Sequence, residues 1–130
     1  MIRAIVVADC GSAMASLITA LAEIDTVEIV RHATGRADVG PLARRLGADL
    51  VFVDELHWPP LVLSRVAEIA KNAPDAGVIV LTSTPDAGWL ADALRHGAAA
   101  VAASNLDPAT LARLVREVLA SPTTPVSLAA

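Results

Sequence analysis

Two aspartates and two hydroxyl residues stand at the ends of short apolar runs, where ligand-binding side chains of sheet proteins commonly lie. Asp9 and Asp54 each directly follow such a run, Thr82 ends one, and Ser104 follows another. Carboxylates held close together repel each other, which favours a bound divalent cation or a raised pKa. The four residues together predict a polar crevice, although any one of them alone is more simply an ordinary strand-end residue.

Short apolar segments alternate with helical patterns along the whole chain. Runs rich in β-branched residues predict strands at residues 3–8, 27–32, 50–53, 77–82 and 99–103. Apolar residues at helical spacing predict helices at residues 11–23, 38–46, 60–72, 85–96 and 108–120. Thr84-Pro85 and Asp107-Pro108 read as an N-cap followed by the first helical residue, whereas Gly47 and Gly97 read as helix ends.

Five strand–helix units in this rhythm predict a parallel sheet covered by helices on both faces. The expected fold class is therefore α/β, a flavodoxin-like (βα)5 doubly wound sheet with strand order 2-1-3-4-5. A four- or six-stranded variant stays open, since the run at residues 99–103 is weak. In this order the ligand crevice lies beyond the first and third strands, which end at Asp9 and Asp54.

The length of 130 residues fits one domain, which we expect to span residues 1–120. The proline- and hydroxyl-rich end, residues 121–130, predicts a linker or flexible tail. The lone Cys10 excludes an internal disulfide and suits a reducing compartment, so we expect a cytoplasmic location.

Composition argues against two classes of partner. The net charge is −4 and no segment is basic, so we expect no direct nucleic acid binding. The longest apolar runs are too short to span a bilayer, so we expect no membrane association. No Gly-x-Gly motif occurs, which argues against a nucleotide-binding enzyme or a cofactor carrier on the same fold.

The order and spacing of several short motifs carry a family resemblance. The chain resembles bacterial two-component receiver domains over residues 2–120. The motifs are Ile-Arg-Ala-Ile-Val-Val-Ala-Asp at residues 2–9, Asp-Leu-Val-Phe-Val-Asp at 49–54, Val-Ile-Val-Leu-Thr-Ser at 78–83, Ala-Leu-Arg-His-Gly-Ala at 93–98 and Leu-Asp-Pro-Ala-Thr-Leu at 106–111.

The resemblance implies a regulatory role and no enzymatic activity. By it, Asp54 matches the aspartate that accepts a phosphoryl group from a histidine kinase. Asp9 matches one of the acidic pair that binds Mg²⁺ together with Asp54, and the backbone carbonyl of Leu56 would be the third protein ligand. Thr82 matches the residue whose hydroxyl moves toward the phosphoryl group.

The sequence departs from the family pattern at three positions of this pocket. Ala8 stands where the first acid is expected, Ser104 where the family has a lysine, and Val101 where it has an aromatic switch residue. Lys71 is the only lysine of the chain and lies in a predicted helix, so no shift of alignment restores the missing one. We therefore expect weakened Mg²⁺ binding and atypical or absent phosphorylation of Asp54, with Ser104 as a substitute phosphoryl contact.

Two hypotheses for function follow. The first is a signal-receiving domain that controls transcription through a partner or through an output domain absent from this chain. The alternative is a phosphorylation-independent module that binds a protein or ligand, or dimerises. By resemblance, a homodimer would form through the helices at residues 11–23 and 108–120, or through those at 85–96 and 108–120.

Overall fold

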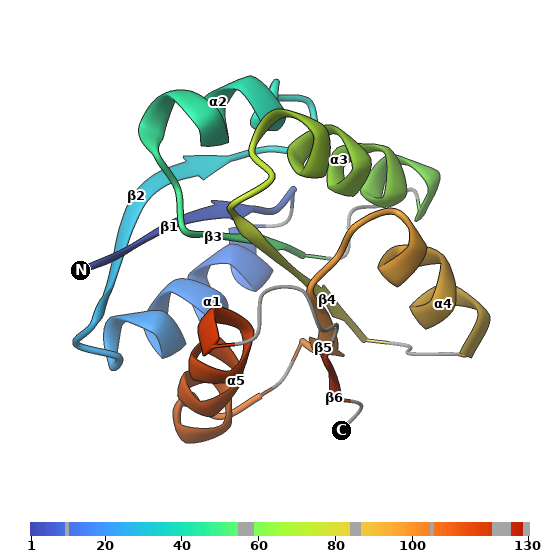
Figure 1. Ribbon diagram of the computed structural model, residues 1–130. Coiled ribbons are helices and arrows are strands. Elements are labelled where there is room, and N and C mark those ends of the chain that lie inside the picture. Colours follow the sequence, from blue (N-terminus) through green and yellow to red (C-terminus); the bar gives the residue numbers. More distant parts are fainter. Residues whose placement is uncertain (10, 55–58, 84–86, 105, 121–125, 129–130) are drawn as a thin grey trace.

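A parallel sheet with helices on both faces positions the candidate residues (Figure 1). The structure is a computed structural model and describes the chain except residues 10, 55–58, 84–86, 105, 121–125 and 129–130. The strands are β1 (Ile2–Val7), β2 (Val27–Ala33), β3 (Leu50–Val53), β4 (Gly77–Thr82), β5 (Ala100–Ala103) and β6 (Val126–Leu128). The helices are α1 (Gly11–Ala22), α2 (Val39–Leu46), α3 (Pro59–Asn72), α4 (Ala87–Arg95) and α5 (Pro108–Ala120).

The strands lie in the order β2-β1-β3-β4-β5-β6, and every neighbouring pair is parallel. The predicted flavodoxin-like order 2-1-3-4-5 is thus confirmed for the first five strands. Strands β3 and β4 have the predicted bounds, because buried parallel strands read as near-continuous β-branched runs. Among the described residues no helix is long and apolar enough to cross a membrane.

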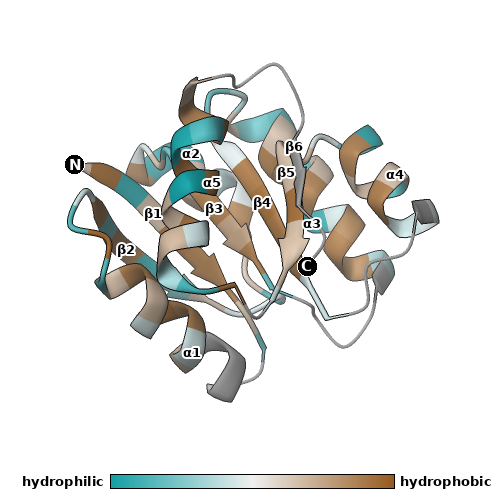
Figure 2. Ribbon diagram, turned by 90° about the horizontal axis from the view of Figure 1, so that it is seen from below, coloured by the Kyte–Doolittle hydropathy of each residue, from teal (hydrophilic) through white to brown (hydrophobic). Residues whose placement is uncertain are grey.

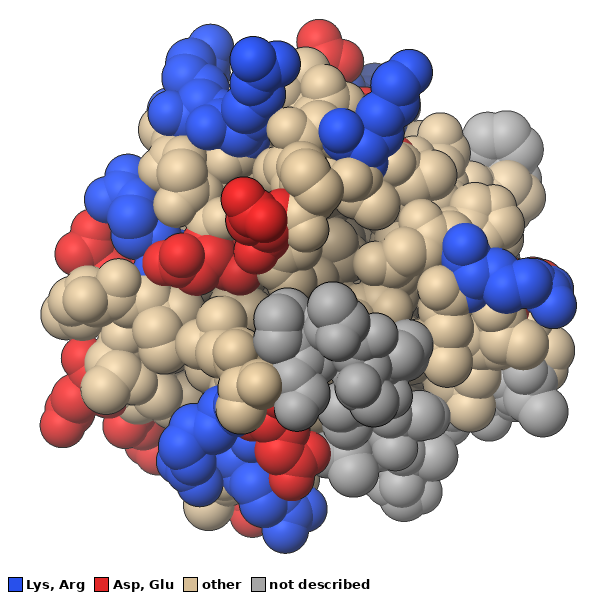
Figure 3. Space-filling model, viewed as in Figure 1, with Lys and Arg blue, Asp and Glu red and all other residues tan. Residues whose placement is uncertain are grey.

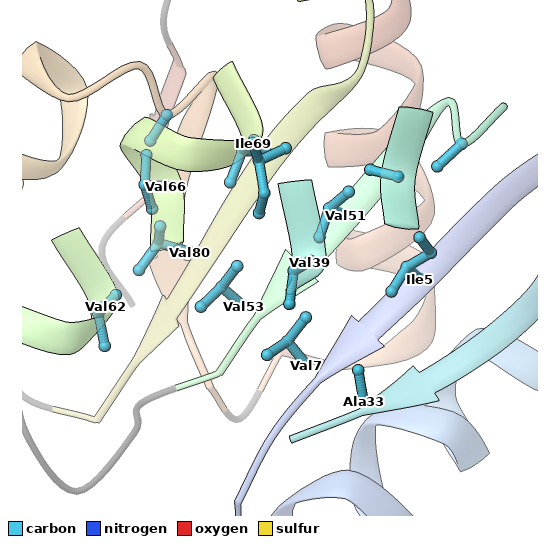
Figure 4. Close-up of a cluster of buried hydrophobic side chains, with 14 of the residues drawn as sticks. Ile5, Val7, Ala33, Val39, Val51, Val53, Val62, Val66, Ile69 and Val80 are labelled. Atoms are coloured by element: carbon cyan, nitrogen blue, oxygen red, sulfur yellow. The ribbon is translucent and has the colours of Figure 1, made fainter. Parts of the chain in front are cut away.

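Helices α2, α3 and α4 cover one face of the sheet, and α1 and α5 cover the other (Figure 1). On the first face Ile5, Val53 and Val80 of three strands point toward Val39 of α2 and Ile69 of α3 (Figure 4). All five side chains are fully buried. Burial of each such side chain stabilises the fold by roughly 1.5–3 kcal/mol.

The opposite face of the sheet holds the second half of the core. Phe52 of β3, the only phenylalanine in the chain, packs there with Leu21 of α1 and Leu114 of α5. The strands are coloured mostly as apolar between the more polar outer faces of the helices (Figure 2). Because successive strand residues alternate between the two faces, each strand contributes to both halves of the core.

Strand β6 lies inside the segment that the sequence predicts to be a linker or tail. Val126–Leu128 pair in parallel with β5, so the sheet has six strands among the described residues. A three-residue strand is too short to show an alternating pattern, and the neighbouring prolines and hydroxyl residues dominate the composition of this segment. Residues 121–125 and 129–130 of the same segment lie outside the described part of the chain.

The predicted helix ends are found where the structure describes them. Asp107 caps α5, since its Oδ1 accepts a hydrogen bond from the Thr110 backbone N–H at 2.8 Å. Gly47 and Gly97 have positive φ angles of 62° and 115°, which side chains rarely tolerate. The predicted start of the fourth helix at Thr84-Pro85 lies outside the described residues, and α4 begins at Ala87.

We expect Gly40→Ala to destabilise the protein by about 1–3 kcal/mol, because α2 and α3 approach closely at this glycine. A Cβ atom at position 40 would lie 2.8 Å from the backbone oxygen of Glu68 and 2.7 Å from Nδ2 of Asn72. The measurement is the free energy of unfolding in urea. Gly11→Ala is the matched control, since no atom lies within 4 Å of a Cβ there. Equal stability of the two variants would contradict the close approach.

The Asp107 cap predicts a pH-dependent contribution to stability. Hydrogen bonds from the Thr110 side chain and backbone hold the pKa of Asp107 below its ordinary value. A carboxyl group with a lowered folded-state pKa stabilises the fold fully above the unfolded pKa of about 3.9, and loses this effect as the pH falls through the folded value. We expect Asp107→Ala to lower the melting temperature at neutral pH and to lower it less below about pH 3. A loss that stays constant with pH would contradict this assignment.

Candidate functional site

The carboxyl ends of the inner strands meet at one edge of the sheet and place Asp54 and Thr82 there. Val53, the last residue of β3, pairs with Val7 of β1 and with Val80 of β4. The Asp54 N–H then donates to the Val7 carbonyl at 2.8 Å, so Asp54 directly extends the ladder beside β1. Thr82 is the last residue of the neighbouring strand β4.

Asp54 and Thr82 are the buried polar side chains of the described residues, with exposed fractions of 5% and 2%. Burying a polar group is costly unless it has a partner. Within the described part of the chain no buried side-chain nitrogen or oxygen lacks a hydrogen-bond partner. Both residues therefore have interaction partners, and both lie at the carboxyl edge of the sheet.

Asp9 also lies just beyond β1, but it is exposed and one of its oxygens is already engaged. The Gly35 N–H donates to Oδ1 of Asp9 at 2.7 Å. The carbonyl of Gly35 in turn accepts a hydrogen bond of 2.6 Å from Nε of Arg65 on α3. Asp9 therefore anchors the loop between β2 and α2, a structural role that the sequence analysis did not predict.

The guanidinium of Arg65 connects this loop to α3. Its NH1 group lies 2.8 Å from Oε2 of Glu68, and Oε1 of Glu68 accepts a hydrogen bond of 3.2 Å from the Gly40 N–H. The Arg65 and Glu68 side chains are 18% and 25% exposed, so the pair is largely shielded from solvent. Arg65 is thus neutralised by Glu68. The network joins three segments that are far apart in the sequence, around residue 9, residues 35–40 and residues 65–68, and no local motif indicates it.

Ser104 is joined to Thr82 by a backbone hydrogen bond, but its side chain lines a cavity that Thr82 does not line. Its N–H donates to the Thr82 carbonyl at 3.1 Å, and its exposed side chain lines a cavity of about 220 Å³ between α1 and α5. The lining residues are Ser16, Leu17, Ala20, Leu81, Ala103, Ser104, Leu106 and Leu111. Asp9, Asp54 and Thr82 are not among these lining residues.

The donor set can be compared with what Mg²⁺ requires. Mg²⁺ commonly keeps several waters and takes only one or two protein carboxylates. Asp9 and Asp54 supply carboxylates at the carboxyl ends of the neighbouring strands β1 and β3, and one Asp9 oxygen is engaged by the Gly35 N–H. No cluster of three or more His, Cys, Asp or Glu side chains occurs in the described part of the chain, and Leu56, the expected third ligand, lies outside it.

Charged side chains of both signs are scattered over the face drawn in Figure 3. No broad, purely basic surface is visible on that face, and the whole chain carries a net charge of −4.

Comparison with known proteins places the fold. No protein-family model and no curated protein matches the chain. Among solved structures, a LuxR-family two-component response regulator from Aurantimonas sp. SI85-9A1 is 20% identical, with a TM-score of 0.80 over 95% of this chain and 87% of that chain. A response regulator from Thermotoga maritima is 22% identical, with a TM-score of 0.77 over 93% of this chain and 100% of that chain.

The isolated REC domain of RcsB from Salmonella enterica serovar Typhimurium is 16% identical, with a TM-score of 0.76 over 97% of this chain and 92% of that chain. At such low identity the likeness establishes the fold. The chain has the flavodoxin-like fold of response regulator receiver domains, as its motifs predict.

Proposed function

We propose that this chain is a signal-receiving regulatory domain of the response-regulator kind, and that Asp54 is its phosphoacceptor. The observation that carries the proposal is the buried Asp54 carboxylate at the carboxyl end of β3, beside a buried Thr82 at the end of β4. The input is a histidine kinase or another signalling protein in the cytoplasm. The output is a partner or an output domain outside this chain, through which transcription is controlled.

The chemistry at Asp54 is a phosphoryl transfer. A carboxylate oxygen of Asp54 attacks phosphorus, an acyl phosphate bond forms, and the bond from phosphorus to the donor breaks, with the electron pair leaving on the donor. The Thr82 hydroxyl then donates a hydrogen bond to a phosphoryl oxygen. Because the phosphoryl group adds charge at a buried edge, a bound Mg²⁺ held by Asp9 and Asp54 would offset it.

The transfer is proposed to be slow compared with that of an ordinary receiver. A lysine contact to the phosphoryl group is missing, since Lys71 lies in the last turn of α3 and Ser104 lines the cavity between α1 and α5. Ala8 offers no carboxylate beside Asp9. Preorganised charges of this kind are each worth a few kcal/mol of transition-state stabilisation. Ser104 or water in place of the lysine supplies a weaker contact.

A second candidate function is a phosphorylation-independent module that dimerises or binds a partner. The observation that favours it is the surface of α1, which carries no charged residue although Ala15, Ser16 and Thr19 are exposed. Depletion of charge is typical of the centre of protein interfaces. In this alternative two copies pair through α1 and α5, around the cavity that Ser104 lines.

The proposed phosphorylation is tested by intact mass after incubation with Mg²⁺ and acetyl phosphate. We expect a partial, slow gain of one phosphoryl group on the wild type and none on Asp54→Asn, because the amide cannot accept it. Asp75→Asn, at an exposed turn position, is the matched control and should label as the wild type does. No gain under conditions that label an ordinary receiver would favour the second candidate function.

The dual role of Asp9 predicts different outcomes for two substitutions. Asp9→Asn keeps an oxygen that can accept the Gly35 N–H, but it removes the charge that attracts Mg²⁺. We expect it to weaken Mg²⁺ binding and labelling about tenfold or more while the free energy of unfolding changes little. Asp9→Ala should also lose the loop anchor, at a cost of about 0.5–1.5 kcal/mol.

Titration of Mg²⁺ by calorimetry and unfolding in urea measure the two effects separately. Equal Mg²⁺ affinity of the wild type and Asp9→Asn would contradict the proposed ligand role. Equal stability of the two Asp9 variants would contradict the anchoring role.

A further inference from the structure

The two outer strands of the five-stranded receiver-like sheet, β2 and β5, are protected against pairing with another chain in different ways. At one edge, β2 carries exposed charged residues, Glu28 and Arg31, and its pairing with β1 shifts register between Ala4 and Ile5. Charged side chains and irregular pairing are devices that keep edge strands from joining other chains. The residues of β2 itself thus disfavour its pairing with another chain.

Strand β5 has neither of these protections. Its sequence is Ala-Val-Ala-Ala, and all four residues are buried. Its register with β4 is regular from Ala100 to Ala103. A regular, uncharged strand with free backbone groups along its outer side is a template for pairing with another chain.

What covers this edge in the structure is β6. Val126, Ser127 and Leu128 pair with Ala100, Val101 and Ala102 respectively, and the views from two directions both place β6 outside β5 (Figures 1 and 2). Five residues separate the end of α5 from β6, a usual length for a helix-to-strand connection. A three-residue edge strand makes few ladder hydrogen bonds and is among the first parts of a fold to open.

We propose that the outer edge of β5 is a self-association surface and that β6 is its removable cover. When β6 is displaced, a second copy of this chain pairs with the exposed edge. A two-fold axis places β5 of one copy antiparallel to β5 of the other, which joins the two sheets into one. The β5 edge suits this occupant because the small side chains of β5 present no charge for the identical strand to oppose.

This surface is distinct from the α1–α5 surface of the second candidate function, and it does not depend on phosphorylation of Asp54. In the closed state β6 occupies the side of the sheet between α4 and α5 (Figure 1). The cover therefore also disfavours the predicted pairing through the fourth and fifth helices, and leaves α1 with α5 for a dimer of the closed form.

The test uses the full chain with single proline substitutions in β6. Successive backbone N–H groups of a strand point to opposite sides, so only one of Ser127→Pro and Leu128→Pro removes a donor that faces β5. The other variant is its matched control. Both are made in an Ala15→Glu background, which places a charge on the exposed surface of α1 and blocks association through that helix.

Sedimentation over a concentration series gives the dimer dissociation constant. We expect one proline variant to dimerise at least tenfold more tightly than its control, with a mass rising from 13.4 kDa toward twice that value. A synthetic peptide of residues 121–130 should reverse this association, because it refills the edge. Hydrogen exchange should show protection of the amides of residues 100–103 in the dimer.

Three outcomes would overturn the proposal. Folded proline variants that both stay monomeric would show that the β5 edge does not self-associate. Loss of the folded circular dichroism spectrum in both variants would show that β6 is an integral strand and not a removable cover. Association without added protection of the amides of residues 100–103 would place the contact between the two copies on a surface other than the β5 edge.

Discussion

Burial of the inner parallel strands on both faces is the constraint on which the rest of this structure depends. Every residue of β3 and β5 is buried, so helices must cover both sides of the sheet. Polar side chains are excluded from the middle of such strands, because an unpartnered buried polar group is costly. They are accommodated where the strands end, which is where Asp54 and Thr82 lie. The position of the candidate site is therefore a consequence of the core.

Because of the same constraint, the residues that determine the fold differ from the residues that could carry chemistry. The core is built by apolar residues of the strands and helices, whereas Ala8 and Ser104 stand just beyond the ends of β1 and β5. A receiver-like fold can thus be kept when residues at the strand ends differ, and the fold alone does not establish the function. The link from Asp9 through Gly35 to Arg65 adds a structural reason for an acidic residue at the end of β1.

Because the sheet is open and not closed into a barrel, it has two edge strands. A closed barrel has no edges, but an open sheet must protect two. Here β2 is protected by its own charged residues, and β5 is protected by a strand added from the C-terminal segment. The proposed pairing of β5 between two copies would link the last described strand to the state of association of the domain, a property separate from the chemistry of Asp54.

The five βα units, their order, the Asp107 cap and the position of Asp54 and Thr82 at one edge could all be predicted from the amino-acid sequence. These features are encoded locally, in β-branched runs, helical spacing and the turn residues Gly47 and Gly97. Because the strands are parallel, their carboxyl ends meet at one edge of the sheet. Three features could be seen only in the folded chain: Asp9 accepts a hydrogen bond from the Gly35 N–H, Ser104 lines the cavity between α1 and α5, and Val126–Leu128 form a strand. Each of these depends on contacts between segments distant in the sequence, and a short strand or a single hydrogen bond leaves no periodic pattern by which it could be predicted.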